Sequence, residues 1–336
     1  MNFLIWGAGA IGGTIGAHLA RAGHAVTFVD RAADHVAAIN RKGLSITGPI
    51  HQFTVPAPAF TPETITGEHA IILLCVKAQD TEGAARALAP HLARDGYVVS
   101  AQNGLNELVI SEIVGRERTM GCFVNFGADY HAPGEVMFGG RGAVVVGEMD
   151  GQITPRLQTL HQALLAFEPN AIMTGNIFGY LWGKLAYGAQ LFATALTDDS
   201  IADCLADPDY RALYIALARE VMQVAQAAGI QPEAFNGFNP HAFTPAADYS
   251  VSLQSLEEMV AFNRKSAKTH SGIWRDLAVR KRRTEVDPQL GPIVTFGQKY
   301  GVPTPITARL IELIHDIEEG RRPQSGETLA TLAAVI

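Results

Sequence analysis

The segment GAGAIG at residues 7–12 constrains the fold of this chain more than any other feature. It follows a short apolar run, NFLIW at residues 2–6, and leads into a segment whose Ile15, Leu19 and Ala22 share one helical face. The pattern G-x-G-x-x-G alone is weak, but a preceding strand and a following helix give it the required context. The chain is therefore predicted to begin with the first strand–turn–helix unit of a parallel α/β sheet.

Each glycine of this turn has its own predicted task. Gly7 permits the tight turn, Gly9 lets the backbone approach a pyrophosphate, and Gly12 lets the helix pack closely on the sheet. The helix N-terminus then faces the anion. A dinucleotide is accordingly predicted to lie on six residues: Gly7, Ala8, Gly9, Ala10, Ile11 and Gly12. The alternative is a glycine-rich turn with a purely structural role.

The alternation of strand-like and helix-like segments predicts a doubly wound α/β sheet over residues 1–170. AIILLCV at 70–76 is typical of a strand buried on both faces. LSITG and QFTVPA are predicted to pair, and GEVMFGGRGAVVVGE is predicted to form a hairpin. Helical periodicity follows, apart from a predicted loop at 231–248. We expect a Rossmann-type dinucleotide-binding domain at 1–170 and an all-α domain for substrate and catalysis at 171–336.

Composition and charge exclude several classes of protein. The 336 residues carry a net charge of −7, which gives no basic surface for nucleic acid. The three cysteines are far apart and predict reduced thiols in a cytoplasmic protein, and the histidines lack metal-ligand spacing, so no metal is expected. The start does not resemble a signal peptide. The apolar stretch at 171–196 contains a lysine and several glycines, which favours a buried helix over a membrane span.

Two charged residues at the end of the second strand bear on the choice of coenzyme. Asp30 lies eighteen residues after Gly12, where an acid bonds the ribose 2′-hydroxyl of NAD. Arg31 follows directly and suits the 2′-phosphate of NADP. A carboxylate repels that phosphate unless it turns away, so the two signals conflict. In the alternative interpretation both are solvated loop charges.

Polar residues also follow the next two strands. Lys77 ends the buried strand, and Asn103 comes after GYVVSAQ. Ligands of such sheets bind at the carboxyl ends of the strands, so Lys77 is predicted to contact phosphate or ribose. Asn103 is predicted to contact both coenzyme and substrate. The alternatives are a surface lysine and a turn-forming asparagine before Gly104.

A lysine interrupts the apolar segment YLWGKLAYGAQLF at 180–192. A lysine is rarely buried without a partner or a function, so Lys184 is a candidate to polarise a carbonyl oxygen in a cleft between the domains. A lysine whose ammonium reaches water is the alternative. Its neighbours on a helix are Tyr180, Leu181, Tyr187 and Gly188. Further on, Glu285 in TEVD is predicted to lie in the first turn of a helix that ends before Gly301, where an acid is an ordinary partner of the helix dipole.

Nine motifs in order over residues 1–320 resemble the ketopantoate reductase (2-dehydropantoate 2-reductase) family. They are GAGAIG, GHAVTFVDR, VKAQDT, QNG, PGEV, WGKLAYG, SGIWRDL, RRTEVDPQLG and GVPTP. The resemblance implies NADPH-dependent reduction of a 2-oxo acid to a 2-hydroxy acid. It also implies that Lys184 is the catalytic acid, that Glu285 contacts substrate and coenzyme, and that Ser271 lies near the substrate carboxylate. The glycine loop, Arg31, Lys77 and Asn103 match the family's coenzyme and substrate residues.

The chain departs from the family pattern where substrate is expected to bind. Gly188 and Phe192 stand where the family usually has asparagines, and residues 231–248 resemble an insertion. We therefore expect a substrate site lined in part by Gly188, and a 2-oxo acid that is more apolar or larger than ketopantoate or lacks its hydroxyl. Lys268, His270 or Arg275 would aid Ser271.

Several alternatives stay open at this point. One is a related NAD(P)-dependent dehydrogenase acting on another 2-oxo or 2-hydroxy acid. Another is a member of the wider hydroxyacid or imine dehydrogenase group, and a third is a dinucleotide sensor without catalysis. A homodimer is compatible with the apolar helical domain, but only fold-level analogy supports it.

Overall fold

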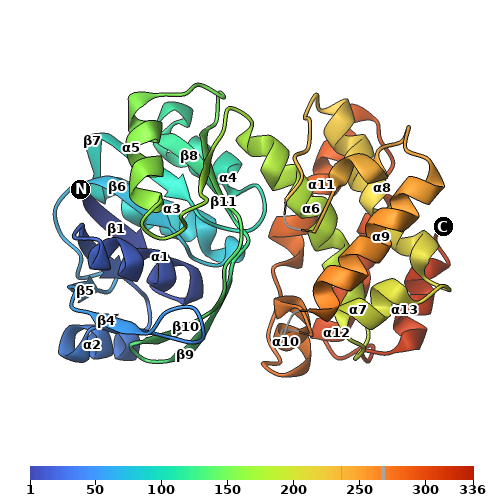
Figure 1. Cartoon of the computed structure of the whole chain (residues 1–336), viewed down its shortest axis with the longest axis horizontal. Coiled ribbons are helices and arrows are strands. Elements are labelled where there is room, and N and C mark those ends of the chain that lie inside the picture. The colour runs from blue at the N-terminus through green and yellow to red at the C-terminus, as the bar shows by residue number, and fades with distance from the viewer. Residues whose placement is uncertain (236, 266–268) are drawn as a thin grey trace. The chain divides into compact units, whose positions relative to one another are not determined.

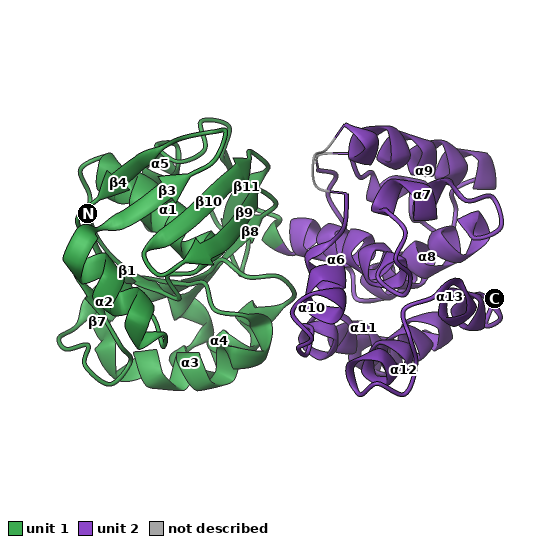
Figure 2. Ribbon diagram, turned by 90° about the horizontal axis from the view of Figure 1, so that it is seen from below, with its two compact units in different colours: residues 1–177 green, residues 178–336 purple. Residues whose placement is uncertain are grey.

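The chain divides into two units, Met1–Ile177 and Phe178–Ile336 (Figure 2). The computed structural model describes residues 1–235, 237–265 and 269–336. The division comes after Ile177 rather than after residue 170, because β12 (Ile172–Met173) still pairs in parallel with β11 (Val144–Glu148). The predicted order of an α/β unit followed by a helical unit is confirmed (Figure 1).

The first unit is built on an eight-stranded sheet with the order β12-β11-β8-β7-β6-β1-β2-β5. The strands from β5 to β8 pair in parallel, whereas β11 runs antiparallel to β8. The remaining strands of this sheet are β1 (Asn2–Trp6), β2 (Ala25–Val29), β5 (Ala59–Phe60), β6 (His69–Leu74), β7 (Leu92–Ser100) and β8 (Thr119–Val124). Because parallel strands end at one edge, the loops after β1, β2, β6 and β7 share the carboxyl edge of the sheet.

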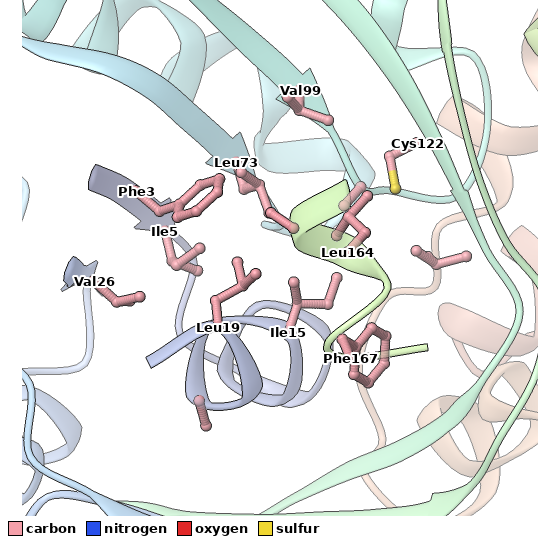
Figure 3. Close-up of a cluster of buried hydrophobic side chains, with 14 of the residues drawn as sticks. Phe3, Ile5, Ile15, Leu19, Val26, Leu73, Val99, Cys122, Leu164 and Phe167 are labelled. Carbon is pink, nitrogen blue, oxygen red and sulfur yellow. The ribbon is translucent and has the colours of Figure 1, made fainter. Parts of the chain in front are cut away.

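Helices cover both faces of this sheet, which explains the uninterrupted apolar strands. Phe3 and Ile5 of β1 gather with Ile15 and Leu19 of α1 on one face (Figure 3). The alternate β1 residues, Leu4 and Trp6, pack instead with residues of α3 and α4. The helices of this unit are α1 (Ala10–Arg21), α2 (Ala33–Lys42), α3 (Thr81–Leu88), α4 (Asn106–Val114) and α5 (Pro155–Leu164), with 3₁₀ turns at Ala78–Asp80, Ala89–His91 and Arg116–Arg118.

A second sheet corrects one prediction. Its order is β4-β3-β10-β9, formed by β3 (Leu44–Thr47), β4 (Phe53–Val55), β9 (Gly127–Ala132) and β10 (Glu135–Gly140). The predicted β3–β4 pair is confirmed. The predicted hairpin of β10 with β11 is wrong, because β10 pairs with β9 and β3 while β11 pairs with β8. The glycine-rich segment between β10 and β11 instead carries the chain from one sheet to the other. Gly142 in this segment packs closely on the backbone, since a Cβ there would lie 2.0 Å from the Asn125 carbonyl oxygen.

The second unit is helical, with α8 packed against α9, α11 and α12. The segment at 231–248, predicted as a loop, holds a 3₁₀ turn at Pro240–Phe243 and an isolated bridge between Phe235 and Phe238. Among the described residues, no helix has both the length and the apolar character needed to cross a membrane. The helices are α6 (Ile177–Thr194), α7 (Ile201–Ala206), α8 (Arg211–Ala227), α9 (Tyr249–Arg264), α10 (Gly272–Ala278), α11 (Val286–Tyr300), α12 (Pro305–Glu318) and α13 (Gly326–Ala333).

Candidate active site

The glycine loop between β1 and α1 has room for a pyrophosphate at one position. Gly7 has φ +100°, and a Cβ there would lie 2.9 Å from the Cys75 carbonyl carbon. A Cβ on Gly12 would lie 2.1 Å from the Gly7 carbonyl oxygen. Gly7 and Gly12 are thus required by close backbone packing. A Cβ on Gly9 meets nothing within 4 Å, so Gly9 borders open space beside the start of α1, which fits a bound pyrophosphate.

Side chains from β2 and α2 fix the loop at Ala8. The Ala8 N–H donates to Asp30 Oδ2 at 2.9 Å, and His35 Nε2 contacts the Ala8 carbonyl oxygen at 3.0 Å. The Gly134 N–H donates to His35 Nδ1 at 2.9 Å, so the ring proton of His35 lies on Nε2 and is donated to Ala8. Sequence reasoning missed His35 because only its place on the buried face of α2 distinguishes it.

The two charged residues after β2 have different surroundings. Both carboxylate oxygens of Asp30 accept backbone N–H groups, from Ala8 at 2.9 Å and from Ala32 at 3.0 Å. Arg31 extends outward, with 79% of its side chain exposed, and its Nη1 lies 3.2 Å from Asp80 Oδ1. Asp30 therefore orders the glycine loop, while Arg31 is accessible to a ligand.

Buried side chains join the loops that carry Lys77 and Asn103. Lys77 is exposed and Asn103 half-buried, and each lies in the loop after a strand, Lys77 after β6 and Asn103 after β7. Gln102 Nε2 donates to the Val76 carbonyl oxygen at 2.9 Å and to Thr81 Oγ1 at 2.8 Å. The Thr81 hydroxyl donates to Asn106 Oδ1 at 2.9 Å, and Asn106 Nδ2 donates to the Asn103 carbonyl oxygen at 2.6 Å. This network sets the two candidate residues relative to each other.

Replacing Gln102 by leucine should destabilise the first unit by about 1–3 kcal/mol, because the partly buried Val76 carbonyl and the buried Thr81 hydroxyl lose their donor. Urea denaturation measures the loss, and titration with coenzyme should show weaker binding. Gln52→Leu is the matched control, since Gln52 is exposed and its Nε2 donates to the Gly48 carbonyl oxygen at 3.2 Å in an exposed hydrogen bond. Equal effects of the two substitutions would contradict the role of the network.

Lys184 lies on the least buried stripe of α6. Five half-buried residues recur at helical spacing, and the residues between them are buried. The five are Tyr180, Lys184, Tyr187, Gly188 and Leu191. Lys184 is thus partly desolvated and partly reachable. Phe192, expected from the family pattern to stand at a substrate position, is fully buried and lies off this stripe.

The segment after residue 230 packs against the first half of α6. The Glu233 N–H donates to the Gly179 carbonyl oxygen at 2.9 Å, and a Cβ on Gly183 would lie 2.6 Å from the Glu233 carbonyl oxygen. Phe235 and Phe238 contact Tyr187, with ring centroids 6.1 and 5.6 Å away. Burial raises the pKa of Tyr187. The apparent insertion therefore adds aromatic rings next to the Lys184 stripe.

The two glycines that flank Lys184 should respond oppositely to alanine. Gly183→Ala should destabilise the second unit by about 1–3 kcal/mol, because its methyl overlaps a backbone oxygen 2.6 Å away. Gly188→Ala should be neutral or stabilising by up to about 1 kcal/mol, since its methyl meets only Gln289 Oε1 at 3.9 Å and alanine favours the helix. Thermal denaturation of both variants is the measurement. A Gly183→Ala variant as stable as Gly188→Ala would contradict the close approach.

Glu285 lies between two residues, Thr284 and Asp287, that contact α12. It is 8% exposed and occupies the N-cap position of α11. The Thr284 N–H and hydroxyl both donate to Glu318 Oε1 at 2.7 Å, and Asp287 pairs with His315 at 3.0 Å. Glu318 and His315 both belong to α12, which thereby fixes the start of α11. The predicted end of α11 before Gly301, at φ +71°, is confirmed.

Gly188 and Glu285 belong to neighbouring surfaces of the second unit. The Cβ position of Gly188 lies 3.9 Å from Gln289 Oε1, and the Gln289 N–H donates to the Glu285 carbonyl oxygen at 3.1 Å. Gly188, one member of the Lys184 stripe, therefore lies beside the first turn of α11.

Ser271 is a helix cap. It is 4% exposed, and its Oγ accepts the Trp274 N–H at 3.1 Å at the start of α10. His270 Nε2 lies 3.0 Å from the Asp198 carbonyl oxygen. Lys268 lies outside the described residues. Arg280 and Arg282 both pair with buried Asp276, at 3.0 and 2.9 Å, so part of the basic run has a structural partner.

Comparison with known proteins assigns both halves of the chain. The family described as ketopantoate reductase PanE/ApbA matches residues 3–151, and the family described as ketopantoate reductase PanE/ApbA C terminal matches residues 176–318. The 2-dehydropantoate 2-reductase of Archaeoglobus fulgidus is 29% identical, over 94% of this chain and 97% of its own. That of Streptococcus pyogenes is 26% identical, with the same two coverages.

Solved structures share the fold over nearly the whole chain. A ketopantoate reductase of the PanE/ApbA family from Ralstonia eutropha has a TM-score of 0.81 at 28% identity, covering 96% of this chain and 99% of its own. D-mandelate dehydrogenase, solved with NADH and anilino(oxo)acetate, has a TM-score of 0.83 at 24% identity, covering 95% and 99%. The similarity to D-mandelate dehydrogenase shows a shared fold. The chain belongs to the ketopantoate reductase family and is an NAD(P)-dependent oxidoreductase acting on CH–OH groups.

Proposed function

We propose that this chain reduces a 2-oxo acid to the 2-hydroxy acid with NADPH, and that 2-dehydropantoate is the first candidate substrate. The observation that carries the proposal is Lys184, a half-buried cation on the same stripe of α6 as Gly188, which lies beside the first turn of α11. The names of the relatives from Archaeoglobus fulgidus and Streptococcus pyogenes support 2-dehydropantoate as the substrate.

The first unit is proposed to hold the coenzyme. The open space at Gly9 fits the pyrophosphate, and Arg31, Lys77 and Asn103 stand after strands at the carboxyl edge of the sheet. Asp30 keeps the loop in shape through its bond to Ala8. When bound, a reduced nicotinamide supplies a hydride to a carbonyl carbon.

The second unit is proposed to hold the acid and the substrate contacts. Lys184 stabilises the negative charge that develops on the C2 oxygen and donates the proton that completes the hydroxyl. Partial burial strengthens this stabilisation because little water screens the ammonium. Ser271 contacts the substrate carboxylate, and Glu285 orients a substrate hydroxyl and contacts the coenzyme. Its fixed place at the start of α11 supports that role.

A different, more apolar 2-oxo acid is the second candidate substrate. Gly188 provides no side chain beside Lys184, and the rings of Tyr187, Phe235 and Phe238 cluster on the same part of α6. An apolar side chain gains by burial against such rings.

The test is coenzyme oxidation by the purified protein with 2-dehydropantoate and a panel of aliphatic and aromatic 2-oxo acids, using NADPH and NADH in turn. Turnover of 2-dehydropantoate at least ten times faster than of the others would support the first candidate. Turnover only of apolar acids would support the second. Tight coenzyme binding without turnover of any acid would contradict both and favour a dinucleotide sensor.

A further inference from the structure

An acidic residue holds the arginine that follows β2. Asp80 lies at the N-cap position of α3, where an aspartate ordinarily accepts a helix N–H. Here its side chain makes no such cap, and Oδ1 lies 3.2 Å from Arg31 Nη1. The pair is accessible, since 79% of the Arg31 side chain and 34% of that of Asp80 are exposed. Asp80 is therefore placed to act on whatever Arg31 binds.

Two other carboxylates, Asp30 and Asp34, lie near Arg31 in the sequence. Asp30 precedes Arg31 and is turned toward Ala8 and Ala32. Asp30 and Asp34 both lie close enough to Tyr130 that, after burial, their charges raise the pKa of its hydroxyl. Of these carboxylates, Asp80 forms an ion pair with Arg31, at 3.2 Å.

The 2′-phosphate of NADPH and the 2′-hydroxyl of NADH would interact differently with the Arg31–Asp80 pair. A phosphate monoester carries a charge of about −1.5 to −2 at neutral pH, and it must draw Arg31 from Asp80 while standing near the Asp80 charge. A 2′-hydroxyl has no charge and needs neither step. Lys77 lies three residues before Asp80 in the chain. Its positive charge favours the binding of either coenzyme, since both carry a pyrophosphate.

We propose that Asp80 is a determinant of coenzyme choice: it holds Arg31 and repels the 2′-phosphate, which weakens NADPH binding and leaves NADH binding unchanged. The inference rests on the proposed function, because it requires the adenosine ribose at the end of β2. It implies that Asp80 lowers the preference of the wild-type chain for NADPH over NADH.

The test is the dissociation constant of each coenzyme with the full-length protein, from nicotinamide fluorescence titration at low salt without substrate. Asp80→Asn should tighten NADPH binding roughly ten-fold and change NADH binding less than about two-fold. The gain should shrink at about 0.5 M salt, because exposed charges are then screened. Asparagine also suits an N-cap position, so α3 should remain intact.

Two further variants separate the mechanism from a general charge effect. Glu82→Gln removes the same charge two residues away, where Glu82 pairs with Arg86 at 2.9 Å, and should leave the ratio of the two constants unchanged. Arg31→Gln should weaken NADPH binding. Adding Asp80→Asn to Arg31→Gln should improve NADPH affinity by a smaller factor than Asp80→Asn does in the wild-type chain. An unchanged NADPH constant in Asp80→Asn, or an equal gain in Glu82→Gln, overturns the inference while the proposed function stands. Failure of wild type to bind either coenzyme overturns both.

Discussion

Lys184→Ala is expected to lower kcat by about 10²–10⁴-fold while the fold and coenzyme binding stay intact. Lys184 lies on the half-buried stripe of α6, so its removal deprives the developing oxyanion of both a nearby charge and a proton donor. Lys184→Met should show the same loss, because methionine keeps the apolar stem without the charge. Steady-state kinetics with the best 2-oxo acid of the panel is the measurement, with circular dichroism as the check on folding.

Lys299→Met is the matched control for this loss. Lys299 belongs to the same unit, but it is exposed, and its Nζ lies 5.2 Å from the centre of the Tyr300 ring. Its kcat should stay within about two-fold of wild type, since surface substitutions rarely disturb a distant site. Addition of small primary amines should restore part of the rate of Lys184→Ala and none of that of an inactive, misfolded protein. A kcat of Lys184→Ala equal to wild type would end the assignment of Lys184 as the acid.

The fold could be predicted where the sequence pattern has one structural explanation. The run at 70–76 is apolar without alternation because both faces of β6 are covered, and only a parallel, doubly covered sheet requires that. The hairpin was mispredicted because alternation shows that a segment is a strand and not which strand it pairs with. The parallel partner of β10 is β3, some ninety residues earlier, since Glu135 aligns with Ser45.

The site divides in the same way. Motif residues such as Gly7 and Lys184 could be named because their types and spacing match a chemical task. The residues that position the loops around the candidate site could not be named, since His35, Gln102 and Glu318 act through hydrogen bonds between segments far apart in sequence. Gly183 and Gly188 look alike in the sequence and differ only in what surrounds them. Such contacts appear only once the chain is folded.

A buried carboxyl in the first unit should make its stability fall as pH rises. Glu107 of α4 is 1% exposed, and among the described residues no hydrogen bond of good geometry reaches either carboxylate oxygen. Burial raises the pKa of Glu107 from 4.5 to about 7, and nearby Ser100 offsets only part of this effect. Gly121 of β8 lies beside this carboxyl, since a Cβ on Gly121 would be 3.5 Å from Oε1 of Glu107.

The direction of this pH dependence follows from comparing the ionisation of Glu107 in the folded and the unfolded chain. Below pH 4.5 the carboxyl is protonated in the folded and the unfolded chain, so it adds no pH dependence. Between 4.5 and about 7 it ionises only in the unfolded chain, which favours unfolding progressively as pH rises. Above about 7 it is ionised in both states, and the full penalty, about 3 kcal/mol from the size of the shift, applies.

Glu107→Gln should therefore remove this loss, because the amide fills a similar volume and cannot ionise. Urea denaturation from pH 5 to pH 8 should show the variant and wild type diverging as pH rises, with the variant more stable by up to about 3 kcal/mol at pH 8. Glu112→Gln, an exposed substitution on the same helix, is the control and should follow wild type. The difference between the two variants isolates Glu107 from the other titrating groups. Parallel stability curves for Glu107→Gln and wild type would mean that the Glu107 carboxylate is solvated or paired in solution, so that burial does not penalise its charge.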